Sequence, residues 1–251
     1  MKEKILVEVC CGSVDDALEA QRGGADRVEL NTSLMYGGLT PSAGSIIEAK
    51  RRLAIPVMVM IRPRGGGFCY TDVEMGVMEQ DVQMALQCGA DGIVFGILKE
   101  DGTIDEERCR RIIGLAQGKD AVFHRAFDVV PDPFRALEQL IALGVKRILT
   151  MGQQNSLFEG AALVKKLIGR AAGRIEILPG GWQTYQMSEM IRDIGCDQIH
   201  IASYIEKKDP SALARPHVYF GAALRPPEDR YELVDCEYVK MMRAKTEGPL
   251  E

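Results

Sequence analysis

Residues 5–30, ILVEVCCGSVDDALEAQRGGADRVEL, hold one full unit of the pattern that decides the fold. The run at 5–9 is short and apolar, as buried strands are. Ser13 can cap the helix that we expect over 14–23, and two aspartates then fall in its first turn, where the helix dipole favours acids. A glycine pair stops this helix, and a second apolar run follows at 26–30. The stretch therefore predicts a strand, a helix and a parallel strand in succession.

The same unit recurs along the chain. Apolar runs predict strands at 5–9, 26–30, 56–62, 91–96, 120–126, 146–151, 174–179 and 197–202. Helix-like patterns between them cover residues 14–23, 42–53, 72–88, 105–116, 133–143, 158–170 and 184–194. Alternating strands and helices favour a parallel sheet. Eight units in 251 residues predict an α/β fold, a (β/α)8 TIM barrel, and no linker divides residues 1–251 into more than this single domain.

The chain continues beyond the eighth predicted strand as a C-terminal extension. Residues 203–228 are rich in Pro, Arg and Ala and are long for a connection. We therefore expect an irregular excursion there that serves the function or binds a partner. A helix-like pattern over 229–245 predicts the final helix of the chain.

Composition narrows the class of protein. The net charge is −5 with acids and bases interspersed, so nucleic-acid binding is not expected. The beginning of the chain, MKEKILVEVCCGS, has too short an apolar run for a signal peptide or a membrane span, which predicts a cytoplasmic protein without a membrane partner. The seven cysteines are irregularly spaced and form no CxxC, which supports neither a disulfide framework nor a zinc knuckle.

Alternation along the strands predicts which polar side chains enter the barrel. In PVMVMIR (56–62) the valines and Ile61 suit the helix-facing side, so both methionines and Arg62 point inward. The same argument turns a set of polar side chains toward the carboxyl-terminal mouth, where barrel enzymes keep their sites: Glu8, Cys10, Glu29, Arg62, His124, Thr150 and His200. For any one of them a structural ion pair is the alternative, and for His200, between two isoleucines, a satisfied core histidine.

Residues 122–133, VFHRAFDVVPDP, begin like a strand and end like the first turn of a helix. Between these parts His124, Arg125 and Asp128 lie within five positions. An imidazole, a guanidinium and a carboxylate together predict a site. We expect His124 to transfer a proton or to hold an anion, Asp128 to orient its ring, and Arg125 to bind the ligand.

Two glycine-rich loops follow predicted strands. RPRGGGFCYTD (62–72) joins Arg62 and Arg64 to three glycines, so side chains and backbone can approach an anion. LPGGW, after the seventh strand, contains Gly180 and Gly181 where barrels often bind phosphate. Neither loop has the spacing of a Walker loop or a dinucleotide fingerprint, so no nucleotide cofactor is indicated. A tight turn is the alternative for the glycines.

Four segments, LVEVCCGSVDDALEAQRGGADRVEL, GGLTPS, MIRPRGGGFCYTD and FHRAFD, stand in this order along the chain. Together they resemble the CutC copper-homeostasis family, from about residue 5 to residue 202. The resemblance implies a cytoplasmic (β/α)8 protein that forms a homodimer or a higher homo-oligomer. It also implies a link to copper tolerance or Cu(I) binding.

The copper site that the resemblance implies departs here from the family pattern. Members proposed to hold Cu(I) often carry one cysteine at the end of the first strand and another at the end of the second. Cys10 matches the first position, but Asn31 occupies the second. Two thiolates suit soft Cu(I) and an amide does not. Cys11 replaces the missing thiolate only if the chain turns it inward.

Two functions remain open at this point. The first is copper homeostasis without catalysis, with Cu(I) or another metal or small molecule as the ligand. The alternative is an enzyme, a lyase, isomerase or hydrolase, acting on a small anionic or sugar-like metabolite. In an enzyme, Glu8 and Glu29 divide acid and base roles or hold a hard divalent metal. Arg62 then binds an anionic group of the ligand. The competing interpretation is that Glu8 or Glu29 neutralises Arg62 in an internal ion pair. The catalytic candidates are then Glu8, Glu29, Arg62, His124 and Asp128, and the ligand-binding candidates are Arg64, Arg125, Thr150, Gly180, Gly181 and His200.

Overall fold

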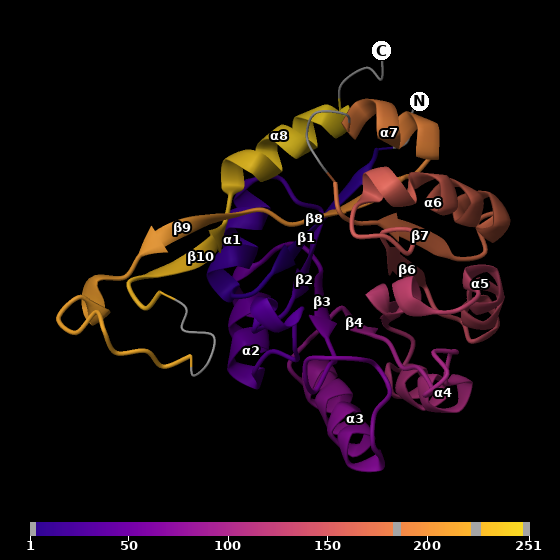
Figure 1. Ribbon diagram of the computed structural model, residues 1–251, viewed down its shortest axis with the longest axis horizontal. Helices are drawn as coiled ribbons and strands as arrows, with labels where there is room; N and C mark the ends of the chain where they lie inside the picture. The colour runs from indigo at the N-terminus through magenta and orange to yellow at the C-terminus, as the bar shows by residue number, and fades with distance from the viewer. Residues whose placement is uncertain (1–3, 183–186, 222–226, 248–251) are drawn as a thin grey trace.

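The computed structural model describes residues 4–182, 187–221 and 227–247. Its centre is a sheet of eight parallel strands in the order β7-β6-β5-β4-β3-β2-β1-β8. The strands are β1 (Leu6–Cys11), β2 (Arg27–Leu30), β3 (Val57–Met60), β4 (Gly92–Phe95), β5 (Asp120–Phe123), β6 (Arg147–Thr150), β7 (Glu176–Pro179) and β8 (Gln198–Ile201). The first and last strands of this order, β7 and β8, lie side by side, so the sheet is a nearly closed barrel (Figure 1). The predicted TIM barrel is confirmed.

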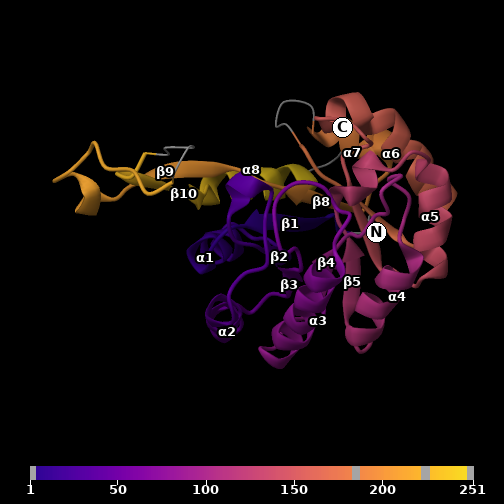
Figure 2. The same cartoon turned by 60° about the horizontal axis from the view of Figure 1, so that its bottom comes forward.

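Helices surround the barrel (Figure 1, Figure 2). They are α1 (Val14–Arg22), α2 (Ala43–Arg52), α3 (Asp72–Gln87), α4 (Glu106–Leu115), α5 (Pro133–Ala142), α6 (Leu157–Ala171), α7 (Met187–Ile194) and α8 (Cys236–Glu247). The predicted cap is present, since Ser13 Oγ accepts a hydrogen bond from the amide of Asp16. The predicted helix over 184–194 begins at residues that lie outside the described part of the chain.

The strands are buried on both faces, as central strands of a parallel barrel are. In β3, Val57 and Val59 belong to the large core between the sheet and the helices. Their neighbours Met58 and Met60 form a small separate cluster inside the barrel with Val94 and Val122. The alternation predicted for this strand is therefore confirmed. Continued past the end of a strand, the same alternation sets which side chains point into the mouth of the barrel.

The C-terminal extension differs from the expected irregular excursion and early helix. Strand β9 (Tyr204–Lys208) pairs in antiparallel fashion with β10 (Arg230–Val234), and a short 3-10 turn, η4 (Pro210–Ala212), follows β9. The last helix therefore begins at Cys236 and not at 229. Residues 222–226, within the predicted excursion, lie outside the described residues. This hairpin projects from the barrel as an arm, and α8 returns to the barrel wall (Figure 1, Figure 2).

Charged groups anchor the base of the arm and the last helix. The buried Asp16 of α1 accepts a hydrogen bond from the amide of Val234 at 2.7 Å. Arg243 of α8 pairs with Asp26 at 2.8 Å, at the start of β2. Within the described segments, no helix has both the length and the apolar character needed to cross a membrane.

Candidate functional site at the mouth of the barrel

Glu8 is a buried acid on the inner face of β1. The register places it beside Arg27 of β2 and His200 of β8, and it pairs with both. The distance between His200 Nδ1 and Glu8 Oε1 is 2.8 Å. Burial raises the pKa of this carboxyl, but the charge of Arg27 and the hydrogen bond with His200 outweigh burial, so the pKa of Glu8 lies well below its usual range. Glu8 is therefore ionised at neutral pH.

A network of charged and polar side chains extends from Arg27 across the barrel, near the beginnings of the strands. Arg27 also donates to Gln198 Oε1 at 2.6 Å, and Arg147 of β6 donates to the same oxygen at 3.1 Å and to Glu176 at 2.7 Å. Sequence reasoning missed both arginines, although Arg27 shares the inward parity of Glu29. The network crosses the barrel interior and neutralises charges that burial would otherwise destabilise.

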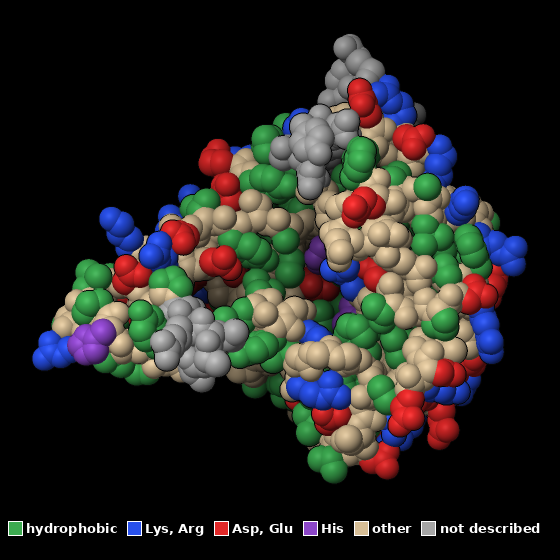
Figure 3. Space-filling model, viewed as in Figure 1, with side chains coloured by type: hydrophobic (Ala, Val, Ile, Leu, Met, Phe, Trp, Pro, Cys, Tyr) green, Lys and Arg blue, Asp and Glu red, His purple; other side chains and the backbone are tan. Residues whose placement is uncertain are grey.

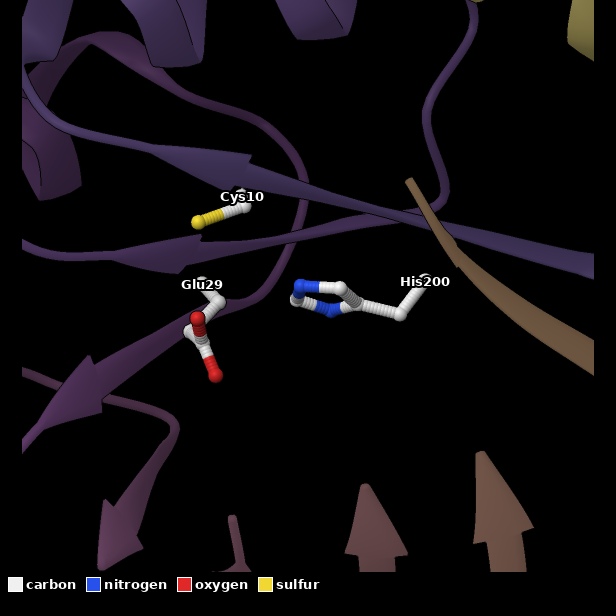
Figure 4. A group of neighbouring side chains, drawn as sticks. All are labelled: Cys10, Glu29 and His200. Carbon is white, nitrogen blue, oxygen red and sulfur yellow. The ribbon is translucent and has the colours of Figure 1, made fainter. Parts of the chain in front are cut away.

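Three potential metal ligands meet at the carboxyl ends of neighbouring strands. Cys10 of β1, Glu29 of β2 and His200 of β8 each offer one ligand atom, and these atoms all lie within 4.8 Å of one another. Cys10 and Glu29 are register partners, which places them side by side. Figure 4 shows the imidazole of His200 directed toward the other two side chains. Thiolate, carboxylate and imidazole are all ligands of first-row divalent metals, so the residues fit a metal ion.

The proton affinities of these three groups differ from their ordinary values. Burial raises the pKa of Cys10 and that of Glu29. Burial lowers the pKa of His200, but its hydrogen bonds with Cys10 and Glu8 and the charge of Glu29 outweigh burial and hold that pKa well above its usual value. The sequence left two interpretations of His200 open, a ligand-binding residue and a satisfied core histidine. Its Nδ1 is hydrogen-bonded to Glu8, and the same ring faces Cys10 and Glu29.

Asn31 lies directly beside this cluster. Its Nδ2 is 3.6 Å from Cys10 Sγ and donates to Glu29 Oε2 at 3.0 Å, while its Oδ1 is buried without a hydrogen-bond partner. Positions 10 and 31 are therefore adjacent in space, as a two-cysteine site requires. The condition under which Cys11 would replace the missing thiolate is not met, because its side chain lies in the core between sheet and helices and not at the mouth.

Arg62 follows β3 and is buried, with 6% of its surface exposed. Its guanidinium donates to the carbonyl oxygens of Tyr36 at 2.8 Å, Gly38 at 3.1 Å and Gly66 at 2.7 Å. Its Nε has no partner, and the Phe68 ring lies 5.3 Å from its Cζ. Neither Glu8 nor Glu29 neutralises Arg62, so the competing interpretation of an internal ion pair is not what the structure shows.

His124 is the residue before the short helix η2 (Arg125–Val129). Its Nδ1 accepts a hydrogen bond from the Ala126 amide at 3.1 Å, whereas its Nε2 is buried without a partner. Burial, together with the charges of Arg62 and Arg125, lowers the pKa of His124 to about 3. His124 is therefore neutral, and Asp128 does not orient its ring.

Asp128 instead organises the loop after β6. Its carboxylate accepts from Thr150 Oγ1 at 2.5 Å and from the amides of Met151 and Gln153, both at 3.1 Å, and it pairs with Arg125 at 2.8 Å. The inward direction predicted for Thr150 is wrong. Ile148, which shares its parity, packs in the core between sheet and helices, so Thr150 also faces away from the barrel axis.

The remaining predicted residues are distributed around the mouth. Arg64 pairs with Glu74 at 2.5 Å and lies over the ring of Tyr70, so it stabilises the loop after β3. Gly180 lies in the mouth, since a Cβ there would be 3.8 Å from His200 Cδ2. Gly181 has a φ of +78°, which favours glycine and fits the alternative of a tight turn.

Tyr204 of β9 is a residue near the cluster that sequence reasoning missed. Its hydroxyl donates to the carbonyl oxygen of Cys10 at 3.0 Å, which ties the base of the arm to the end of β1. Figure 3 shows this face of the molecule hollowed at its centre, with acidic, basic and histidine side chains visible in the hollow.

Fold and site together define a (β/α)8-barrel protein with a candidate metal centre at the carboxyl ends of its strands. A family model described as the CutC family matches residues 5–205. The chain belongs to the CutC family.

Its relatives agree with this assignment. A CutC family protein of Treponema denticola is 50% identical over 236 residues, which cover 94% of this chain and 96% of the relative. A human protein named copper homeostasis protein cutC homolog is 42% identical over 240 residues, which cover 95% of this chain and 88% of the relative. The crystal structure of a CutC protein from Streptococcus agalactiae, 39% identical, superposes with a TM-score of 0.75 and covers 78% of this chain and 98% of that chain.

Proposed function

We propose that this protein handles copper in the cytoplasm and binds a metal ion through Cys10, Glu29 and His200. The observation that carries the proposal is the convergence of their three ligand atoms within 4.8 Å. The names of the relatives, which refer to copper homeostasis, support the choice of copper.

The donor set bears on the oxidation state of the metal. One sulfur, one carboxylate oxygen and one imidazole nitrogen form a mixed set that suits a borderline divalent ion such as Cu(II). A pair of thiolates would suit Cu(I) better, and Asn31 stands where the second thiolate would be. We therefore propose that Cu(I) binds here more weakly than it would to a two-cysteine site.

The experiment is a pair of titrations, one with Cu(II) and one with Cu(I) in competition with a Cu(I) chelator. Cys10→Ser removes one ligand and should weaken binding of both ions by more than about tenfold. Asn31→Cys should strengthen Cu(I) binding because it completes a pair of thiolates. The exposed Cys69 provides the matched control, since Cys69→Ser leaves the mouth intact. Equal metal binding by Cys10→Ser and Cys69→Ser would exclude this cluster as the metal centre.

A second candidate, catalysis on a small anionic metabolite, is favoured by one specific observation. Glu8 and Glu29 lie on neighbouring strands, and their surroundings move the pKa of Glu8 down and that of Glu29 up. Two carboxyls whose pKa values are separated in this way can serve as base and acid. NMR of phosphorylated sugars incubated with the protein tests this idea. Turnover should disappear in Glu29→Gln, and the absence of turnover of any of them by the wild type would refute it.

A further inference from the structure

One layer of the barrel interior brings two polar side chains together across a glycine. The interior cluster contains Met60 of β3, Val94 of β4 and Val122 of β5, which are neighbours in register. Two residues further along each strand, the same inward parity brings Arg62, Gly96 and His124 to the mouth. The middle position carries no side chain, and a Cβ on Gly96 would collide with the ring of His124.

The two side chains on either side of Gly96 keep unused hydrogen-bond donors. The guanidinium of Arg62 donates to three neutral carbonyl oxygens and interacts with the neutral hydroxyl of Tyr70. No carboxylate in the part of the chain that the structure describes forms an ion pair with it. Its Nε has no partner at all. A buried charge without a counter-charge is costly in a folded protein.

His124 presents the second unused donor. The amide of Ala126 donates to Nδ1, so the hydrogen of the neutral imidazole lies on Nε2. Only 4% of the surface of His124 is exposed, and Nε2 has no partner. Buried donors are nearly always paired in native proteins, so an unpaired one requires an explanation.

The Phe68 ring covers both groups from the loop after β3. Its centroid lies 4.9 Å from the ring centroid of His124 and 5.3 Å from Arg62 Cζ. We propose that Arg62 and His124 form an oxyanion subsite beneath Phe68, which takes the phosphate group of a small ligand. An anion supplies both missing acceptors and neutralises the buried guanidinium.

The other unpaired polar atoms at the mouth indicate the rest of the ligand. Glu29 Oε1 and Asn31 Oδ1 are buried acceptors without a partner, and they suit hydroxyl groups. Asn31 is close to the subsite, since Gly38 lies against its Oδ1 and the carbonyl oxygen of Gly38 accepts a hydrogen bond from Arg62. The chemical class is therefore a phosphorylated polyol. The subsite itself consists of Arg62 and His124, neither of which is among the proposed metal ligands Cys10, Glu29 and His200, so phosphate binding does not depend on bound metal. Only the hydroxyl contact with Glu29 is shared with the metal centre.

Calorimetric titration of the metal-free protein tests the subsite with two probes, inorganic phosphate and glycerol 3-phosphate, at constant ionic strength with chloride as the reference. His124→Asn keeps an acceptor for the Ala126 amide, because asparagine is a good N-cap, and removes the Nε2 donor. It should weaken phosphate binding by about tenfold or more. Arg62→Lys keeps the charge but loses Nε, and should also weaken binding. The control is His217→Asn, the same change at an exposed position on the arm, which should leave binding unchanged.

The outcomes separate cleanly. Tighter binding of glycerol 3-phosphate than of phosphate supports the subsite and identifies a phosphorylated metabolite, and equal binding supports it for the free anion. Phosphate that binds no better than chloride overturns the proposal. Phosphate that binds wild type and His124→Asn equally well is an adventitious ion only and also overturns it. Because the wild-type measurement needs no variant, a variant that fails to fold leaves the test intact.

Discussion

The protonation of His124 gives a quantitative prediction about stability. Its folded-state pKa of about 3 lies below the ordinary value of 6.5 that applies to the unfolded chain. Between these two values the unfolded state binds a proton that the folded state does not, so stability increases with pH across this window and is lost as pH falls. From pH 7.5 to pH 5 the loss amounts to about 2 kcal/mol, because each unit of pKa difference titrated is worth about 1.4 kcal/mol.

The perturbation that isolates this loss is His124→Asn, which removes the titrating ring and preserves the helix cap. The measurement is the free energy of unfolding in urea at pH 7.5 and pH 5, for both proteins, in a buffer free of phosphate. His200, whose folded-state pKa is raised, contributes stability that is present at low pH and lost as pH rises, but it contributes equally to both proteins. The same holds for the carboxyls, so they cancel in the difference.

The expected result is a difference between wild type and variant that shrinks by about 2 kcal/mol at pH 5. The variant is less stable at pH 7.5, because a smaller side chain leaves unfilled space in the mouth. At pH 5 the wild type has lost the contribution of its neutral buried imidazole, and the variant had none to lose. An unchanged difference at the two pH values would show that His124 is not held neutral, and it would refute this reasoning.

Three further predictions concern packing, the loop after β6 and assembly. Gly96→Ala should lower the free energy of unfolding, measured in urea, by about 1–3 kcal/mol, because the new methyl group meets the ring of His124. The control is Gly114→Ala, on α4 with open space around it, which should not destabilise the protein. Equal effects of the two substitutions would contradict this reasoning. Asp128→Ala should lower the free energy of unfolding by about 1–3 kcal/mol because two part-buried amides lose their acceptor, and a change of a few tenths would contradict that role. Light scattering at micromolar concentration should report a homodimer or larger assembly, since the arm exposes apolar side chains such as Phe220, and a monomer would count against it.

The barrel itself was predictable because its signals are local. The central strands are short apolar runs, and helices such as α1 and α5 begin at a cap and end beside a glycine within a few residues of the next strand. The arm gave no such signal. Residues of β9 and most of β10 are exposed on both faces, so neither strand alternates, and their pairing joins positions as far apart as Tyr204 and Val234.

The direction of side chains was predictable only where the two faces of a strand differ in character. In β3 the methionines and valines sort into separate clusters as expected. In β6 both Ile148 and Leu149 are apolar, so the sequence contains no contrast that decides which of them faces the helices. Thr150 was assigned to the wrong face for this reason. Its hydroxyl is satisfied by Asp128, a partner that depends on the tertiary structure.

At the proposed metal centre, one residue on a fixed framework bears on the chemistry of the site. Strand register makes position 31 a neighbour of Cys10 whatever residue occupies it, because β1 and β2 pair along their length. A cysteine there would give two adjacent sulfur ligands, the set that soft Cu(I) prefers. Asparagine offers an amide instead, and it donates a hydrogen bond to Glu29, which fixes that carboxylate beside His200. In the proposed function, Asn31 therefore supplies no soft ligand and orients a hard one, which favours a divalent ion over Cu(I).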